Sequence, residues 1–547
     1  MTKYIGLKSV CCLLFAAGAA FPAGAQDGDA LNTPASVERI KAGGLWLTHT
    51  NNAAGAILDN ASYYANAAFD YHMSNGTFKQ AQSGKRNNGF GFSTDGGGFL
   101  GDDKKFYVWG EFNYSRDKIR EAQYNASLID PLRRMPFYIA DTSKSKWINQ
   151  GFDMRVKAAT HLIRNKLLLG FEGRYEVGNG AKQKDPRPEV ELSRVEVIPS
   201  LLFRFGKRHS IGADFDYYSR RERGEASVTN LRNNPSIWMM VAPGFFKQGS
   251  IDPNGSPSGL GDYNANSMGG GLQYGYTAER IRIVLSGNYA RTVEDAKTAD
   301  HPNPSPTTTT AQSTERPYFL GTTRKDAFDV NLNAKFDNAS GSHSWYVNLS
   351  YRDDDMDGIE YIQSFDNAPD VQEYVVDFKT VRSNYTQQSA KGEVSLMRNG
   401  SGNDYRWTVG ADAEYVKDGY IYYIPRSTQD VESLRLNAYA KKNFRTGDLS
   451  RLLVGLKVGG SKNLSAEMDY NGYHAEEQCF TDFTLKDFYY LSSSYVHAGA
   501  SVTYSHLGIL KNTAVYTGAA FDIYKMCTHK DLFDQRIFMQ FNLGMTF

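Results

Sequence analysis

Charged side chains recur at every second position in several segments of this chain of 547 residues. Glu172, Arg174 and Glu176, for example, alternate with small or apolar residues. Residues two apart share one face of an extended strand. Such a face can line an aqueous path and set which solutes pass, or its charges can pair and hold another segment in place; both interpretations stay open. We assign to this inward face Glu172, Arg174, Glu176, Arg204, Asp214, Arg282, Lys391, Glu393, Arg406, Asp412 and Glu414.

Two connecting segments, 135–139 (MPFYI) and 237–246 (IWMMVAPGFF), are unusually apolar for loops. Solvated loops would not carry such sequences, because a large exposed apolar patch usually marks an interaction site. Either these loops fold inward and pack on one another, or they contact a partner or a ligand with adaptable Met and aromatic side chains. The residues assigned to the second alternative are Trp238, Met239, Met240, Phe245, Phe246, Phe137 and Tyr138.

Cys479 and Cys527 lie in two connections that flank the same pair of predicted strands. A disulfide between them is the simplest expectation outside the cell. Two unpaired cysteines are the alternative, and a metal or haem site would fit no standard spacing.

The stretch from Asp353 to Gly358 reads D-x-D-x-D-G, which is how a calcium loop opens, but the twelfth position is Ser364 instead of a bidentate Glu. We therefore interpret it as an acidic loop; weak external calcium binding, with Glu360 as an extra ligand, is the alternative. The chain carries no nucleophile elbow, zinc-protease motif or phosphate loop. We expect no enzyme, no catalytic residue, no metal site and no cofactor.

Composition and periodicity indicate the elements that would position these residues. Lys and Arg number 61 against 60 Asp and Glu, so the net charge is +1 and a nucleic-acid partner is not expected. Aromatic residues make up 13%, too many for a disordered chain. Apolar and polar residues alternate at period two, as in 405–415 and 537–547, which predicts strands and hardly any helix.

These segments are each about 10 residues long, the length that a tilted membrane strand needs. Only a closed barrel pairs every backbone group of such strands within a bilayer. We predict an all-β, antiparallel transmembrane barrel of about 18 strands, with 16 or 14 as alternatives, in the cell outer membrane. The predicted strands are 61–72, 88–95, 104–115, 147–160, 166–177, 191–205, 209–219, 268–278, 281–293, 325–337, 343–352, 387–398, 404–416, 431–442, 450–461, 494–505, 513–525 and 533–547; segment 371–380 favours β-structure but has no place among them.

The N-terminal region differs from the rest. Residues 1–25 combine two lysines, a short apolar run and an A-x-A site, which predicts a secretory signal peptide. Residues 26–60 lack alternation and carry small residues suited to close packing inside a lumen. We predict a plug-like lumenal segment there, with Trp46, Asn51, Asn52 and Gly55 as its contact residues, and a barrel over 61–547. A periplasmic tail is the alternative.

The stretch LWLTHTNNAAG, the KDPRP motif at 184–188 and the aromatic C-terminal residue resemble an uncharacterised outer-membrane barrel family of gut anaerobes, known by a domain-of-unknown-function label. The entry segment is also distantly similar to that of fatty-acid-transporter-like barrels, although Asn51-Asn52-Ala53-Ala54-Gly55 lacks their proline. The resemblance implies an outer-membrane location and work beside transport receptors or surface lipoproteins.

Two functions follow as expectations. The first is a channel or plugged transporter for small or amphipathic solutes, gated by residues 27–60 or by the apolar loops. The second is a non-catalytic accessory barrel that anchors a surface lipoprotein or a neighbouring TonB-dependent transporter. Outer-membrane lipid is the expected partner in both cases.

Overall fold

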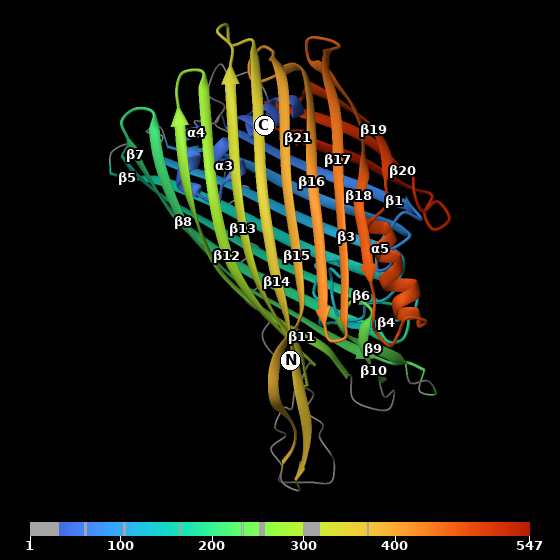
Figure 1. The fold of residues 1–547 in the computed structure, drawn as a ribbon. Helices are drawn as coiled ribbons and strands as arrows, with labels where there is room; N and C mark the ends of the chain where they lie inside the picture. The colour runs from blue at the N-terminus through green and yellow to red at the C-terminus, as the bar shows by residue number, and fades with distance from the viewer. Residues whose placement is uncertain are drawn as a thin grey trace, which may run out of the picture.

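The computed structural model describes residues 32–59, 63–101, 105–163, 166–230, 232, 235–250, 258–298, 318–368 and 371–547. Within them, eighteen strands form one antiparallel sheet that closes into a barrel (Figure 1). Closure is made by β1 (Tyr64–Gly76) and β21 (Gln535–Thr546), which pair from Asn66↔Thr546 to Gly76↔Arg536. The other wall strands, in spatial and chain order, are β2 (Arg86–Leu100), β3 (Phe106–Ala122), β5 (Ser145–Ile163), β6 (Leu167–Lys182), β7 (Arg187–Phe205), β8 (His209–Ser227), β11 (Ser258–Thr277), β12 (Ile281–Lys297), β13 (Phe319–Asp337), β14 (His343–Ala368), β15 (Val371–Asn399), β16 (Tyr405–Tyr423), β17 (Arg426–Arg445), β18 (Ser450–Asp469), β19 (Tyr495–Leu510) and β20 (Thr513–Met526).

The barrel prediction and its strand number are confirmed, and each of the predicted strands coincides with a wall strand. The strands are longer than expected, and β14 and β15 reach 26 and 29 residues. Segment 371–380 is the outer part of β15. The prediction of an acidic loop at Asp353–Gly358 is wrong, because these residues continue β14 and pair with β13 and β15. Beyond the bilayer a strand needs backbone pairing but no apolar face. Its sequence can therefore be as charged as that of a loop.

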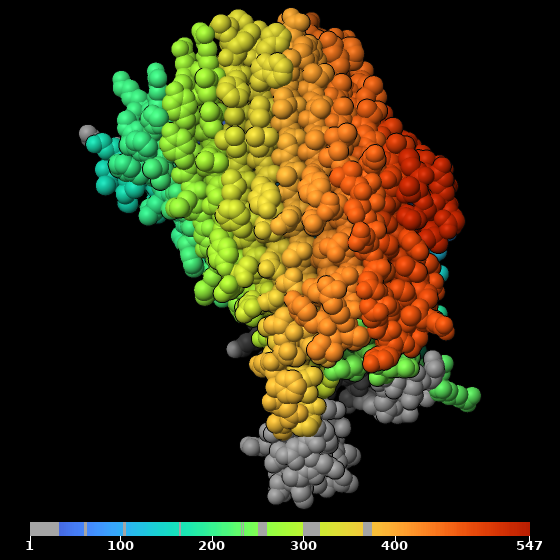
Figure 2. Space-filling view, in the orientation of Figure 1, coloured from blue at the N-terminus to red at the C-terminus, as the bar shows by residue number. Residues whose placement is uncertain are grey.

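The outer face of the wall is apolar. Phe171, Leu272 and Leu543 are 48%, 69% and 60% exposed, and they share this face with many other large hydrophobic side chains. The space-filling view shows the strands from β11 to β20 as one continuous wall (Figure 2). A closed barrel with an apolar outside and a charged inside matches a bilayer. The protein is therefore an outer-membrane barrel, with its short turns and C-terminus on the periplasmic side.

The N-terminal segment, residues 32–59, lies inside the barrel near the end that carries the C-terminus (Figure 1). It consists of α2 (Pro34–Gly43), α3 (Leu45–His49), the 3₁₀ turn η1 (Ala53–Gly55) and α4 (Ala56–Asp59). Among the described residues, no helix combines the length and the apolar character needed to cross a membrane. The predicted signal peptide lies outside the described residues.

A second, small sheet forms at the external end, from β4 (Ile139–Asp141), β9 (Ser236–Ala242) and β10 (Phe245–Ser250). The π-helical turn η2 (Cys479–Thr484) and α5 (Leu485–Leu491) lie in the connection between β18 and β19. We call residues 123–141 together with 236–246 the cap.

Candidate functional site

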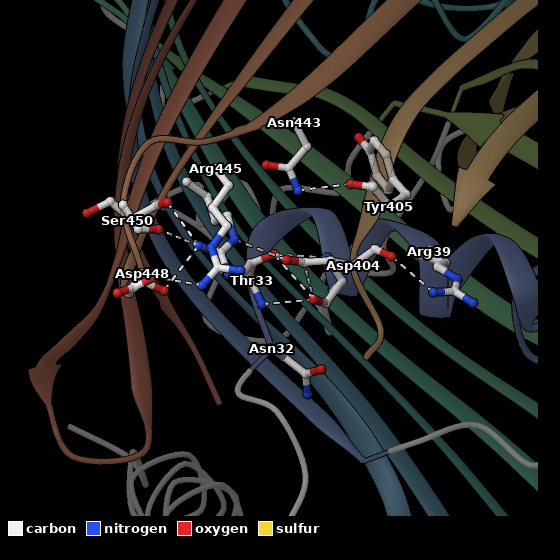
Figure 3. Close-up of polar contacts among 12 residues, drawn as sticks. Asn32, Thr33, Arg39, Asp404, Tyr405, Asn443, Arg445, Asp448 and Ser450 are labelled. Atoms are coloured by element: carbon white, nitrogen blue, oxygen red, sulfur yellow. Dashed lines mark hydrogen bonds and ion pairs between the residues drawn. The ribbon is translucent and has the colours of Figure 1, made fainter. Parts of the chain in front are cut away.

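The N-terminal segment is fastened to a periplasmic turn. Thr33 caps α2 by accepting a hydrogen bond from Ser36 N, and Pro34 occupies the first turn, where no backbone donor is needed. The Asp404 carboxylate, in the turn between β15 and β16, accepts hydrogen bonds from the Thr33 hydroxyl and, at 2.6 Å, from Ser36 Oγ (Figure 3). Arg39 Nη1 donates to the backbone oxygens of Gly402 and Asp404 at 3.1 and 3.0 Å. We call these contacts the latch.

Further contacts hold the segment from three sides of the wall. Lys41 Nζ lies 2.6 Å from Asp95 Oδ2 on β2, and Lys441 Nζ on β17 lies 2.9 Å from Glu38 Oε1. Asn52 Nδ2 donates to Gln273 Oε1 on β11 at 2.9 Å. In the closed sheet, β2, β11 and β17 are six strands apart from one another. The segment therefore spans the whole lumen.

Two buried charges hold α3 at its ends. The Asp59 carboxylate accepts hydrogen bonds from Trp46 N at 3.0 Å and from Leu47 N at 2.8 Å, where the helix begins. Lys157 Nζ on β5 donates to Leu47 O at 2.8 Å and to Thr50 O at 2.9 Å, where the helix ends. The Lys157 side chain is 1% exposed, so water cannot stabilise its ammonium group. These two carbonyl oxygens and Glu172, 3.3 Å away, stabilise the charge instead.

Glycines allow the segment and the wall to meet backbone to backbone. A Cβ atom at Gly170 on β6 would lie 2.1 Å from Ala54 N, and one at Gly55 would lie 2.2 Å from the Trp46 ring. Any side chain at Gly170 would push the segment away from the wall. The close approach to the wall therefore requires glycine at position 170, whereas Gly55 makes room for the Trp46 ring within the segment itself.

The cap lies in the external mouth and packs on the inner surface of the wall. Trp238 of β9 pairs with Ala140 of β4, so the two apolar loops form one sheet. The Tyr124 ring lies between Trp238 and Phe483 with interplanar angles of 8° and 4°. The apolar side chains of the cap form one buried cluster with the inner surface of the wall.

A cavity of about 420 Å³ lies between these two layers. Asn51 of the N-terminal segment borders it on one side, and Arg133, Arg134 and Met135 of the cap border it on the other. Inward-facing residues of β7, β8, β11, β12, β13 and β14 make its wall. We call this cavity the chamber.

The chamber carries charges of both signs. Arg133 lies 2.8 Å from Glu294 and 3.2 Å from Glu222, which also pairs with Arg220. Asp354 is shared in the same way by Lys325 and Arg352, at 2.9 and 3.1 Å. On the other side of the chamber lie Asp214, Asp216 and Asp329, and among the described residues none of these three has a cation within 4 Å. Within the described part of the chain, the chamber therefore presents paired cations on one side and carboxylates without a cation on the other.

With this geometry in view, comparisons place the chain in a family. The model of a family of unknown function (DUF6850) matches residues 53–547. The chain belongs to that family. No curated protein matches it.

Solved structures with a similar fold are outer-membrane receptors and transporters. The ferric preacinetobactin receptor of Acinetobacter baumannii shares 9% identity over 88% of this chain and 80% of its own, with a TM-score of 0.37. The FrpB iron transporter of Neisseria meningitidis shares 7% identity over 90% of this chain and 83% of its own, with a TM-score of 0.43. At these values we take no functional argument from either structure.

The structure places the predicted inward-facing residues of this DUF6850 member in different surroundings. Several pair within the wall, as Arg174 does with Asp153 at 2.6 Å and Arg435 with Glu414 at 3.1 Å. Arg282 Nη1 donates to Asp59 O of the N-terminal segment at 3.4 Å. Of the assigned set only Asp214 lines the chamber. Strand alternation does not settle the direction of Arg406, because the register slips between its neighbours Tyr405 and Trp407.

Other chamber residues were not predicted from the sequence. Arg194 and Glu196 follow the same alternation on a predicted strand, so periodicity could have found them. Arg220 lies just beyond the predicted end of its strand. Arg133 and Arg134 come from a connection with no periodicity, and nothing in the sequence signals that they turn inward.

The residues assigned to a partner contact are mostly buried in the cap. Trp238, Met240, Phe245, Phe137 and Tyr138 are each less than 9% exposed, while Met239 and Phe246 are partly buried against them. In this structure the apolar loops thus pack on each other, the alternative in which they fold inward. A partner could reach most of these side chains only if the cap opened.

The predicted disulfide is not formed, since Cys479 and Cys527 are both free. Cys479 faces the apolar cluster of the cap, whereas Cys527 is exposed. Burial raises the pKa of the Cys479 thiol to about 12, which keeps it protonated and unreactive. The residues expected in the lumenal segment all lie there, with Trp46 2% exposed and Asn52 fully buried.

Proposed function

We propose that this barrel carries a small polar solute across the outer membrane through a lumen closed on both sides. The N-terminal segment acts as the periplasmic plug and the cap acts as the external gate. The observation that carries the proposal is the chamber, which both layers border. A solute would enter when the cap moves, bind in the chamber, and leave when the plug shifts.

The contacts of the two closures support separate movement. The α2 end of the plug is held by hydrogen bonds and ion pairs, such as Ser36 to Asp404 and Glu38 to Lys441. The α3 end is held more firmly, by the buried Lys157 and by apolar packing around Trp46. Exposed ion pairs contribute little, about 0–1 kcal/mol each, so the α2 end can release first without unfolding the wall. The cap packs on the wall through a buried apolar cluster and through ion pairs of Arg133 and Arg134, and we infer that it would move as a unit. No catalytic step is needed in this role.

Solute flux into proteoliposomes tests the proposal. The variant Asp404→Ala combined with Glu38→Gln removes the latch carboxylate and one ion pair. We expect it to raise the flux of small polar solutes roughly tenfold over the wild type, because the plug would open more often. The matched control is Asp448→Ala, at the neighbouring periplasmic turn, where the Asp448 side chain is 95% exposed and, among the described residues, pairs only with Arg445. Equal flux in all three proteins would contradict a plugged transporter.

A second candidate is an accessory barrel that anchors a surface lipoprotein or a TonB-dependent transporter. One observation favours it: the hairpin of β14 and β15 projects beyond the wall (Figures 1 and 2). Among the described residues, β14 pairs with β13 only as far as Ile359, and β15 pairs with β16 only from Ser383. Phe378 on this projection is 57% exposed, and unpaired strand edges can accept a partner strand.

The mass of the native complex separates the two candidates. The protein would be purified from its outer membrane in mild detergent, and the mass of the complex measured. A stoichiometric second protein that Phe378→Ser releases would favour the accessory role. A barrel that runs alone and conducts after plug release would favour transport.

A further inference from the structure

The chamber has an uneven distribution of charge along its wall. Near the cap, two carboxylates each pair with two cations: Glu222 with Arg133 and Arg220, and Asp354 with Lys325 and Arg352. Arg133 also pairs with Glu294, so four cations face three carboxylates and this side carries one excess positive charge. Asp214, Asp216 and Asp329 leave excess negative charge on the rest of the wall.

The negative side has acceptors without donors. Asp214 Oδ1 and Asp216 Oδ1 are enclosed by protein and have no hydrogen-bond partner. Asp214 Oδ2 accepts from Gln273 Nε2 at 2.5 Å, and Asp329 Oδ2 accepts from Asn288 Nδ2 at 2.7 Å, so their partners are neutral amides. An enclosed carboxylate without a cation is costly, and a cationic ligand group would offset that cost.

The positive side has donors without acceptors. Arg352 contacts Asp354 through Nε alone, at 3.1 Å to both oxygens, and its side chain is 53% exposed to the lumen. Its two terminal nitrogens, which form the fork that matches a carboxylate, have no partner among the described residues. Arg134 uses only Nη2, toward Asp418.

One row of the sheet joins the two sides. The cross-strand partners Asp214↔Gly271, Gly271↔Asn288, Asn288↔Asp329 and Asp329↔Arg352 run across β8, β11, β12, β13 and β14. Neighbouring strands lie about 4.8 Å apart. Arg352 is therefore one strand spacing from Asp329 and four strand spacings from Asp214. Within this row Gly271 has no room for a side chain, because a Cβ there would lie 2.2 Å from Asn288 Oδ1 and 2.9 Å from Asp214 Oδ2.

We propose that the chamber binds a short zwitterionic solute of the size of a di- or tripeptide, with its ammonium group on Asp214, Asp216 and Asp329 and its carboxylate on Arg352. The inference rests on the proposed transport function and names its solute class. Uncharged solutes would leave both sets of groups unsatisfied, and singly charged solutes would satisfy one of them. The chamber thus distinguishes solutes by a pair of charges and their spacing.

Four forms of one peptide test the inference: triglycine, N-acetyl-triglycine, triglycine amide, and the peptide blocked at both ends. Their binding to the purified full-length protein would be measured by calorimetry. A hydrogen bond to a charged group contributes about 1.5–3 kcal/mol. We therefore expect free triglycine to bind about 10- to 100-fold more tightly than either singly blocked form, and the doubly blocked form to bind most weakly.

Variants assign each end of the peptide. Asp214→Asn with Asp216→Asn keeps the shapes and removes the charges, and it should weaken triglycine and triglycine amide but leave N-acetyl-triglycine unchanged. Arg352→Gln should weaken triglycine and N-acetyl-triglycine, which carry the carboxylate, but leave triglycine amide unchanged. Asp522→Asn, on β20 and away from the chamber lining, is the matched control and should change nothing. Each variant is first checked for the heat-modified mobility of a folded barrel.

The outcomes separate this inference from the proposed transport. Equal affinity for the four peptides, or binding of none, would overturn the zwitterion inference. The transport proposal would still stand if uncharged solutes pass through the protein in proteoliposomes. Selective binding of triglycine with no flux, even after plug release, would support the site and overturn transport. Selective binding together with flux of triglycine would support both.

Discussion

The carboxylate of Asp404 accepts a hydrogen bond from Ser36 Oγ at 2.6 Å, although the two residues are 368 positions apart. Through this contact a turn between two wall strands fixes the first helix of the lumenal segment. Arg451 Nε lies 3.5 Å from the second carboxylate oxygen and completes the set of partners. The position of the segment is thus coupled to one periplasmic turn.

Loss of this carboxylate should expose the N-terminal segment. We expect Asp404→Ala to speed tryptic cleavage at Arg39 and Lys41 about tenfold in the detergent-purified protein, because local opening becomes easier by roughly 1–2 kcal/mol. Mass spectrometry of the fragments over time checks this. Asp448→Ala should cleave at the wild-type rate, and equal rates for both variants would show that the latch does not hold the segment.

Added volume at Gly170 should displace the same segment from the wall side. A Cβ at this position would meet Ala54 N at 2.1 Å, so Gly170→Ala should destabilise the folded state by about 1–3 kcal/mol. Gly110→Ala is the matched control, since its Cβ would meet nothing closer than Arg155 O at 3.9 Å. Urea unfolding followed by tryptophan fluorescence compares the two, and equal midpoints would argue against close packing of the segment on β6.

Removal of the buried ammonium of Lys157 should be more severe. Lys157→Met would leave Leu47 O and Thr50 O without their donor, and Glu172 would keep only Arg155 among its cations in the described residues. Breaking a buried ion pair costs about 3–5 kcal/mol, and we expect a loss of this size in the same unfolding assay. Lys511→Met, at an exposed periplasmic turn, should change stability by less than about 0.5 kcal/mol.

The pH dependence of one external contact follows from burial of a carboxyl group. Asp487 on α5 accepts a hydrogen bond from Ala81 N at 2.6 Å, and burial raises the pKa of this carboxyl to about 7. A carboxyl whose pKa is higher in the folded state stabilises that state at low pH, and its contribution falls as pH rises from about 4 to about 7. Burial lowers the pKa of the nearby Lys79 to about 8. The titration of Lys79 therefore changes stability only above about pH 7, outside the interval in which Asp487 titrates.

Amide hydrogen exchange measures this effect. Corrected for intrinsic rates, exchange at 77–83 should be faster at pH 7 than at pH 5 in the wild type. In Asp487→Asn the difference should disappear, because no carboxyl remains to ionise. A pH difference that persists in the variant would assign the effect to another group.

The barrel could be predicted from the sequence because each wall strand repeats one simple constraint. Lipid outside and water inside force alternation over about ten residues, as in 537–547, and short turns separate such segments. Outside the bilayer this alternation is not required, and there the prediction of the secondary structure was wrong. Asp353 to Asp357 lie in the part of β14 beyond the bilayer, so their charges resemble a loop although the strand continues.

The candidate site was only partly predictable for a related reason. Ile139–Asp141 is a strand of three residues, too short for a period to show, and it is a strand only because it pairs with β9. The inward turn of Arg133 depends on Glu222 and Glu294, which are remote in sequence. Contacts that arise from the meeting of distant loops leave no local pattern.

The conductance of the purified wild-type protein in planar lipid bilayers tests the central claim most directly. We predict no steady open-pore current, with channel openings that appear when Asp404→Ala and Glu38→Gln release the plug. A large and steady conductance of the wild-type protein would show an open lumen, and it would contradict an account in which the N-terminal segment and the cap close the chamber.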